Sequence, residues 1–190
     1  MKGDSFDRVL YLLIKTFINR LALLPRRQIT ACAGWIGRLW YTIDKRHRTI
    51  ALANLAIAYG CELNAAERER LVKANFIQFA RVLLEIPSLV NLTKDNLDQY
   101  IAFKGQELIQ AALQSGKGVV LLSAHMGNWE LMSLATSLYF DICINGVVRP
   151  IDCTAADNVL AEIRTRTGNR MIDKDDSKDA ISALLREGQV

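Results

Sequence analysis

The stretch from Val119 to Ala135 reads VVLLSAHMGNWELMSLA. Its first four residues, 119–122, form a continuous apolar run between a glycine pair and a polar turn, which is typical of a parallel strand covered on both faces. After Gly127-Asn128 the apolar residues recur at helical spacing, and Asn128 is a favoured N-cap residue. The stretch therefore predicts a strand, a turn and a helix, the repeating unit of an α/β fold.

His125 and Glu130 lie on either side of this turn. In one unbroken helix, residues at this spacing would differ by about 140° and could not face each other. If the Gly-Asn turn places His125 before the helix, the carboxylate of Glu130 can reach one imidazole nitrogen while the other faces a cleft at the strand end. Such a pair suits general-base catalysis on a hydroxyl. The two residues are also compatible with a buried, hydrogen-bonded histidine and a glutamate favoured by the helix dipole.

The segment HMGNWE resembles the H-x4-E signature of the bacterial lipid A biosynthesis acyltransferases, a branch of the lysophospholipid acyltransferase superfamily. Glycerolipid relatives usually carry Asp at the position of Glu130. Three more segments resemble blocks of this family in the same order: RTIALANLAIAY (48–59), GVVRP (146–150) and IRTRTGNRMI (163–172). The resemblance extends from about Leu10 to the last residue.

The resemblance implies an enzyme on the cytoplasmic face of the bacterial inner membrane. It would move a fatty acyl chain from an acyl carrier protein thioester to a hydroxyl of a lipid A precursor or related glycolipid, with His125 as base and Glu130 as its orienting partner. Arg149 and Arg164 would contact the phosphorylated glycolipid or the oxyanion. Backbone N–H groups near Gly127-Asn128 are further candidates for holding the oxyanion.

Alternatives to this interpretation remain open at the level of sequence. Coenzyme A could replace acyl carrier protein, and the acceptor could be an aminolipid or a lysophospholipid. A membrane-binding domain that has kept the fold without turnover is an alternative of another class.

The arginines also have a structural interpretation. The guanidinium group matches two oxygens of a phosphate or carboxylate at once, but Arg164 and Arg166 could equally form surface ion pairs. The candidate partners are Glu162, Asp157 and Asp152. Ser123 is not predicted as a nucleophile, because the glycine pattern of a nucleophile elbow is missing around it.

Composition excludes a disordered chain. Hydrophobic residues make up 51% of the 190 residues and charged residues 23%, with a net charge of +4. None of the four cysteines has C-x-x-C spacing, and Cys32, Cys61 and Cys143 are expected to be reduced core thiols. With only two histidines, a histidine-rich metal site is not predicted. No cofactor is predicted either.

The N-terminal residues 1–50 are expected to form a membrane-associated segment. Residues 6–24 are apolar but carry too many polar interruptions for a clean transmembrane span, so an amphipathic helix in the membrane interface is favoured, with a tilted span as the alternative. Residues 26–48 carry six cations and one acid, interleaved with Trp35, Trp40 and Tyr41. This mixture suits anionic membrane lipid, and no nucleic-acid motif accompanies it.

Residues 51–190 are expected to form the acyltransferase domain, an α/β sheet of the glycerolipid acyltransferase type that appears truncated at its C-terminus. We expect helices at 64–86, 106–113, 155–167 and 178–185, with strands at 119–122, 141–148 and 170–172 and a short one at 100–103. The core stripe expected on the first of these helices consists of Leu71, Val72, Phe76, Phe79, Leu83 and Ile86.

Overall fold

The computed structural model describes residues 5–190, so the first four residues of the predicted membrane-associated segment lie outside the described part. The chain is mostly helical and carries one small parallel sheet. It divides into two compact units, which we call the helical unit (Leu23–Pro87) and the sheet unit (residues 5–22 with Ser88–Val190). The domain boundary expected near residue 50 falls inside a helix of the first unit.

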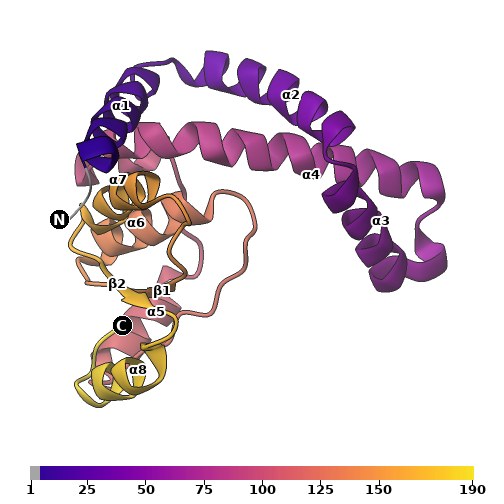
Figure 1. Cartoon of the computed structure of the whole chain (residues 1–190). Coiled ribbons are helices and arrows are strands. Elements are labelled where there is room, and N and C mark those ends of the chain that lie inside the picture. The colour runs from indigo at the N-terminus through magenta and orange to yellow at the C-terminus, as the bar shows by residue number, and fades with distance from the viewer. Residues whose placement is uncertain (1–4) are drawn as a thin grey trace. The chain divides into compact units, whose positions relative to one another are not determined.

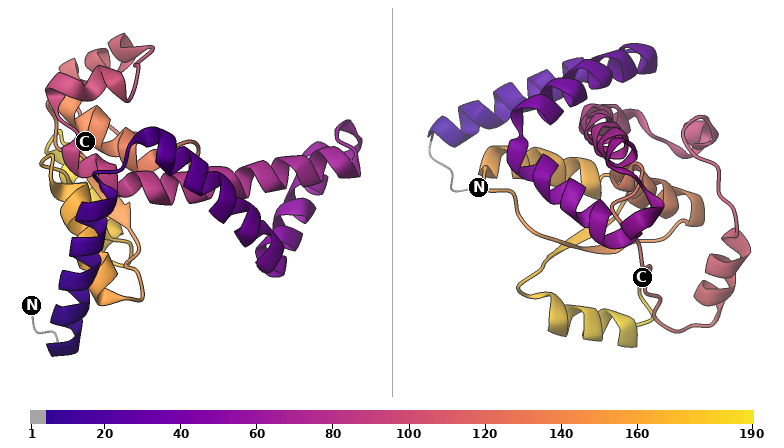
Figure 2. Two further views of the ribbon diagram at one scale, coloured as in Figure 1. Left: turned by 90° about the horizontal axis from the view of Figure 1, so that it is seen from above. Right: turned by 90° about the vertical axis from the view of Figure 1, so that its right-hand side faces the viewer.

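The helical unit contains α2 (Arg26–Ile43), α3 (Lys45–Tyr59), the 3-10 turn η1 (Gly60–Glu62) and α4 (Ala65–Glu85). Figures 1 and 2 show α2 and α3 in violet to purple and α4 in magenta. The N-terminus of α4 has a capping box: the Asn64 side chain accepts from the Glu67 N–H at 3.0 Å, and the Asn64 N–H donates to the Glu67 carboxylate at 2.8 Å.

Helices α2 and α4 pack closely because a glycine lies at their contact. A Cβ on Gly37 would lie 2.4 Å from the Cα of Ile77, so only glycine permits this approach. Within the predicted stripe of α4, Val72 and Phe76 are buried, as expected. The prediction is wrong for three other members of the stripe, Leu71, Phe79 and Leu83, which are 36–45% exposed. The apolar face of α4 is wider than the strip that its neighbours cover.

The sheet unit begins with α1 (Ser5–Leu21) and continues from the 3-10 turn η2 (Ile86–Asn91), which starts at the boundary. Its remaining elements are η3 (Lys94–Gln99), α5 (Gln106–Gln114), α6 (Trp129–Phe140), β1 (Asn145–Val148), α7 (Thr154–Thr165), β2 (Arg170–Asp173) and α8 (Ser177–Arg186). All five helices predicted beyond residue 63, including the one after Asn128, are present, with ends shifted by a few residues.

Strands β1 and β2 are parallel and are joined through α7, which confirms the predicted strand–helix–strand unit (Figure 1). Their register pairs Asn145 with Arg170 and Val148 with Asp173. The first strand is shorter than predicted and begins at Asn145 and Gly146, two residue types that are common in turns. Backbone pairing with β2 therefore outweighs the turn preference of those two residues.

The strand predicted at 119–122 is absent from the sheet, and this prediction is wrong. In the described part of the chain, one backbone hydrogen bond to another segment is formed here, from the Val119 N–H to the Gln189 carbonyl at 3.0 Å. Leu122 is 97% exposed, which contradicts the expected burial on both faces. A strand needs neighbours on which to pair, and composition alone cannot supply them. The short strand predicted at 100–103 is also not formed.

Helix α1 has two distinct faces. One packs on α7, and the other carries exposed apolar side chains: Phe6, Val9, Leu13 and Phe17 are each 56–73% exposed. This pattern agrees with an amphipathic helix. A search of residues 5–190 finds no helix both long and apolar enough to cross a membrane.

The cysteines are free thiols, but they are not the core residues that were predicted. Cys32 and Cys61 are exposed and Cys143 is half-buried. Apolar neighbours in sequence did not ensure burial: Cys32 lies beside the buried positions of α2, and Cys61 lies in η1, which has no buried residue.

Candidate active site

The turn before α6 has the predicted form. Gly127 adopts a left-handed backbone conformation, with φ of +60°, and the Asn128 side chain caps the helix by accepting from the Leu131 N–H at 3.0 Å. A residue with a Cβ would be strained at the first of these positions. The helix begins at Trp129, so His125 precedes it as expected.

His125 is exposed, and its ring lies beside the indole of Trp129. The ring centroids are 5.0 Å apart, with 55° between the ring planes. The alternative of a buried histidine is therefore wrong. An exposed imidazole next to an aromatic wall is accessible to a substrate.

Glu130 is buried in the first turn of α6, where it forms a bidentate ion pair with Arg164 of α7. The Arg164 Nε donates to one carboxylate oxygen at 2.9 Å and its Nη2 donates to the other at 2.5 Å. The Glu130 and Arg164 side chains are 9% and 22% exposed. The hydrogen bonds to Glu130 raise the pKa of Arg164, so the guanidinium stays charged. Arg164 thus forms an ion pair, but with the buried Glu130 and not on the surface with Glu162, Asp157 or Asp152, of which only Asp157 adds a Coulombic contribution. Its contact with substrate stays a prediction.

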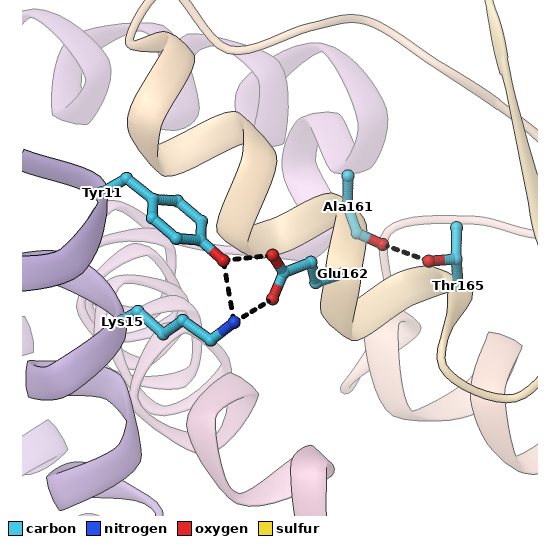
Figure 3. Close-up of polar contacts among 5 residues, drawn as sticks. All are labelled: Tyr11, Lys15, Ala161, Glu162 and Thr165. Atoms are coloured by element: carbon cyan, nitrogen blue, oxygen red, sulfur yellow. Dashed lines mark hydrogen bonds and ion pairs between the residues drawn. The ribbon is translucent and has the colours of Figure 1, made fainter. Parts of the chain in front are cut away.

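Helix α7, which carries this arginine, is fixed on the side that faces α1. Figure 3 shows the Tyr11 hydroxyl donating to Glu162, while the Lys15 Nζ donates to the Glu162 carboxylate and to the Tyr11 oxygen, both at 2.8 Å. The hydrogen bonds from Lys15 and Tyr11 lower the pKa of Glu162, and the same contacts raise the pKa of Lys15. We call these three residues the α1–α7 clamp.

The end of α7 is fixed by Arg166. Its guanidinium donates to the carbonyls of Leu89 and Leu92, at 3.1 and 2.7 Å. Arg166 therefore has a structural role inside the sheet unit, and it pairs with backbone carbonyls rather than with the acidic side chains considered as alternatives.

An open cavity of about 520 Å³ brings the predicted side chains together. His125, Glu130, Arg149 and Arg164 all line it, although they come from four separate elements and loops. Gly127 and Asn128 are not among its lining residues. Ser123 does line it, although it was not predicted as a site residue.

The apolar wall of the cavity was not predicted. Val147, Val148 and Met171 line it from the strands and Met132 lines it from α6. A signal existed: Trp129, Met132 and Ser133 recur at helical spacing and therefore share one face of α6. The pairing of Gly146 with Met171 decides which strand residues join that wall, and the sequence does not reveal this register.

No hydrogen bond joins His125 to Glu130 in the described part of the chain, where Arg164 occupies both carboxylate oxygens. Each carboxylate oxygen has two lone pairs, so Glu130 can accept a further bond from an imidazole without releasing the arginine. The predicted orienting contact thus stays a prediction, and the cavity leaves room for it.

The family model described as bacterial lipid A biosynthesis acyltransferase matches residues 5–190. The chain belongs to this family. No curated protein matches it. For a member of the lipid A biosynthesis acyltransferases, the cavity beside His125 is the candidate active site, because it combines a titratable base, two guanidinium groups and an apolar wall. Membership supports a lipid A acyltransferase type of activity, with a lipid A-type acceptor and an acyl donor in general terms.

Proposed function

We propose that this protein transfers a fatty acyl chain from an acyl carrier protein thioester to a hydroxyl of a lipid A precursor or related glycolipid, with His125 as the general base. The observation that carries the proposal is the convergence of His125, Glu130, Arg149 and Arg164 on one cavity. Acid–base chemistry and recognition of an anionic substrate require these groups to lie together.

The reaction needs no covalent enzyme intermediate. His125 takes the proton of the acceptor hydroxyl, and the oxygen attacks the thioester carbonyl to give a tetrahedral oxyanion. The carbon–sulfur bond then breaks, and His125 returns the proton to the leaving thiolate. General-base catalysis of this kind contributes about 10² to 10⁴ in rate.

In this proposal Glu130 has two partners. Its ion pair with Arg164 holds the carboxylate in place, and its remaining lone pairs accept an N–H of His125, which stabilises the imidazolium. Arg164 keeps its Nη1 group for an oxyanion or a substrate phosphate, and Arg149 lies on the same cavity for a second anionic group. Backbone N–H groups near Gly127 and Asn128 do not line the cavity, so their role as further oxyanion donors stays a prediction from the sequence.

We place the enzyme on the cytoplasmic face of the bacterial inner membrane. The exposed apolar face of α1 supports interfacial binding, and the cations at 26–48 suit anionic membrane lipid. The same positive charge suits acyl carrier protein as an acidic donor.

The decisive experiment compares His125→Ala and Glu130→Gln with Met126→Ala, a change to the exposed neighbour that does not line the cavity. Transfer from labelled acyl carrier protein to a lipid A precursor is measured, with free fatty acid followed in parallel. His125→Ala should abolish transfer, Glu130→Gln should lose a large part of the rate, and Met126→Ala should retain it.

The double variant should be little slower than His125→Ala, because residues that act as a unit are not additive. Near-normal transfer by a folded His125→Ala protein would rule out this mechanism.

A further inference from the structure

One face of α2 packs into the core of the helical unit. Its buried residues recur at every fourth position, and these are Ile29, Ala33, Gly37 and Tyr41. Trp40 also faces inwards, because its indole packs edge to face on Phe76 and Phe79 of α4, with centroids 5.8 and 5.6 Å apart. Figure 1 shows α2 lying along α4. This packing leaves the opposite side of α2 outside the core.

The outer side of α2 is apolar as well. We call it the outer stripe, and it consists of Cys32, Trp35, Leu39 and Ile43. Trp35 is 80% exposed, Leu39 60% and Ile43 69%. Trp35 lies about 160° round the helix from Gly37, the residue at the contact with α4. A helix that is apolar on all sides is normally buried, so the outer stripe indicates a second apolar surface that covers it.

The polar residues beside the outer stripe are cationic. Arg27 and Arg38 are both exposed, and they lie about 80° and 60° from Trp35 round the helix. The sequence of α2 contains three arginines and no Asp or Glu. The helical unit has ten Lys and Arg residues against five Asp and Glu residues, a net charge of +5, which exceeds the +4 of all 190 residues. The excess positive charge of the chain therefore lies in this unit.

This charge favours a lipid surface over a second copy of the chain. In a symmetric contact between two outer stripes, Arg27 and Arg38 would meet an α2 that carries no carboxylate, so the two copies would repel each other. An anionic leaflet attracts the same arginines and accepts apolar side chains between its headgroups. Tryptophan is enriched at that depth, because its ring is apolar and its indole N–H is polar.

We propose that the outer stripe of α2 binds the surface of an anionic bilayer, with Trp35 at the depth of the headgroups and Arg27 and Arg38 beside the lipid phosphates. This contact adds to the exposed apolar face of α1, which belongs to the sheet unit. Of the three aromatic residues among the cations of 26–48, Trp40 and Tyr41 pack on α4, and Trp35 is left for the membrane. The inference rests on the proposed membrane location and is independent of acyl transfer.

Trp35 is a natural fluorescent probe of this contact. Two proteins are compared, Trp129→Phe and the double variant Trp35→Phe/Trp129→Phe, so that emission comes from Trp35 and Trp40 in the first and from Trp40 in the second. Each is mixed with vesicles of equimolar phosphatidylglycerol and phosphatidylcholine that carry bromine on the acyl chains. The first protein should be quenched and the second much less, although sedimentation should show that both bind, because phenylalanine keeps an apolar ring in the outer stripe.

Arg38→Gln tests the cationic side of the outer stripe, and Arg70→Gln is its matched control. Each change removes one exposed arginine from the helical unit, but Arg70 lies about 120° round α4 from Phe76, which packs on α2. Loss of a basic residue near an anionic leaflet should weaken vesicle binding about fivefold for Arg38→Gln, whereas Arg70→Gln should leave it nearly unchanged. Leu39→Gln should reduce the quenching of Trp35. Circular dichroism checks that each variant is folded.

The possible results separate the inference from the proposed membrane location. Vesicle binding with equal quenching whether or not Trp35 is present would overturn the inference and leave α1 as the anchor. Absence of vesicle binding would overturn the membrane location as well. Emission from Trp35 that shifts to shorter wavelength with protein concentration, without lipid, would mean that a second copy covers the outer stripe. Equal weakening by Arg38→Gln and Arg70→Gln would mean that net charge alone attracts the lipid, and either result would overturn the inference.

Discussion

Replacing Arg164 with Met should destabilise the protein by leaving Glu130 as an uncompensated buried charge. Breaking a buried ion pair from one side costs about 3–5 kcal/mol. Because the Arg164 side chain is 22% exposed and that of Glu130 is 9% exposed, water can partly replace the arginine, and we expect the lower end of this range. A loss of about 3 kcal/mol corresponds to a fall in Tm of roughly 6–12 °C for a chain of this size.

The assay is thermal and urea unfolding of the wild type, Arg164→Met, Glu130→Gln and the double variant. In the double variant no buried charge is left alone, so it should be more stable than the sum of the two single losses predicts, by about 1–3 kcal/mol. Helix content measured by circular dichroism controls for misfolding. Equal Tm values for wild type and Arg164→Met, or strictly additive losses, would refute the buried ion pair as a stabilising contact.

Two further predictions concern helix packing and the α1–α7 clamp. Gly37→Ala should lower the free energy of unfolding by about 1–3 kcal/mol or more, because its Cβ would lie 2.4 Å from the backbone of α4. At Gly34 the Cβ of an alanine would meet only the flexible end of Arg38, so Gly34→Ala should leave the stability unchanged or raise it by up to about 1 kcal/mol. Urea unfolding measures the stability of both variants. Because folding lowers the pKa of Glu162, the α1–α7 clamp should stabilise the protein fully at pH values above the ordinary glutamate pKa of 4.5. This stabilisation should be lost as the pH falls through the lower pKa that Glu162 has in the folded protein. Glu162 is 50% exposed, so the effect should be about 0.2–1 kcal/mol, and a Glu162→Gln protein with the same pH dependence as wild type would contradict it.

Local signals in the sequence were enough to predict the turn and the cap that organise the site. Gly127 and Asn128 act through their own backbone and the first turn of α6, so a few consecutive residues contain the whole signal. The start of the helix predicted at 64–86 depends on equally local contacts, because Asn64 and Glu67 cap it within one turn. The H-x4-E segment could likewise be identified as a family signature without any structure.

The ion-pair partner of Glu130 could not be predicted from the residues near it in the sequence. Arg164 lies 34 residues further along the chain, and the sequence offered it nearer acidic candidates, including Glu162. Residues two apart on a helix point in different directions, so α7 turns Glu162 towards α1 and Arg164 towards the cavity. Only the packing of α6 against α7 brings this arginine to the carboxylate.

The sequence by itself determined the helices from residue 64 onwards, the turn before α6 and the family, because each depends on residues close together in the chain. The tertiary structure decided which apolar runs became strands and which side chains face a cavity. The run at 119–122 has the composition of a buried strand, but a strand is stabilised by hydrogen bonds to neighbours distant in sequence, and those bonds formed between β1 and β2 instead.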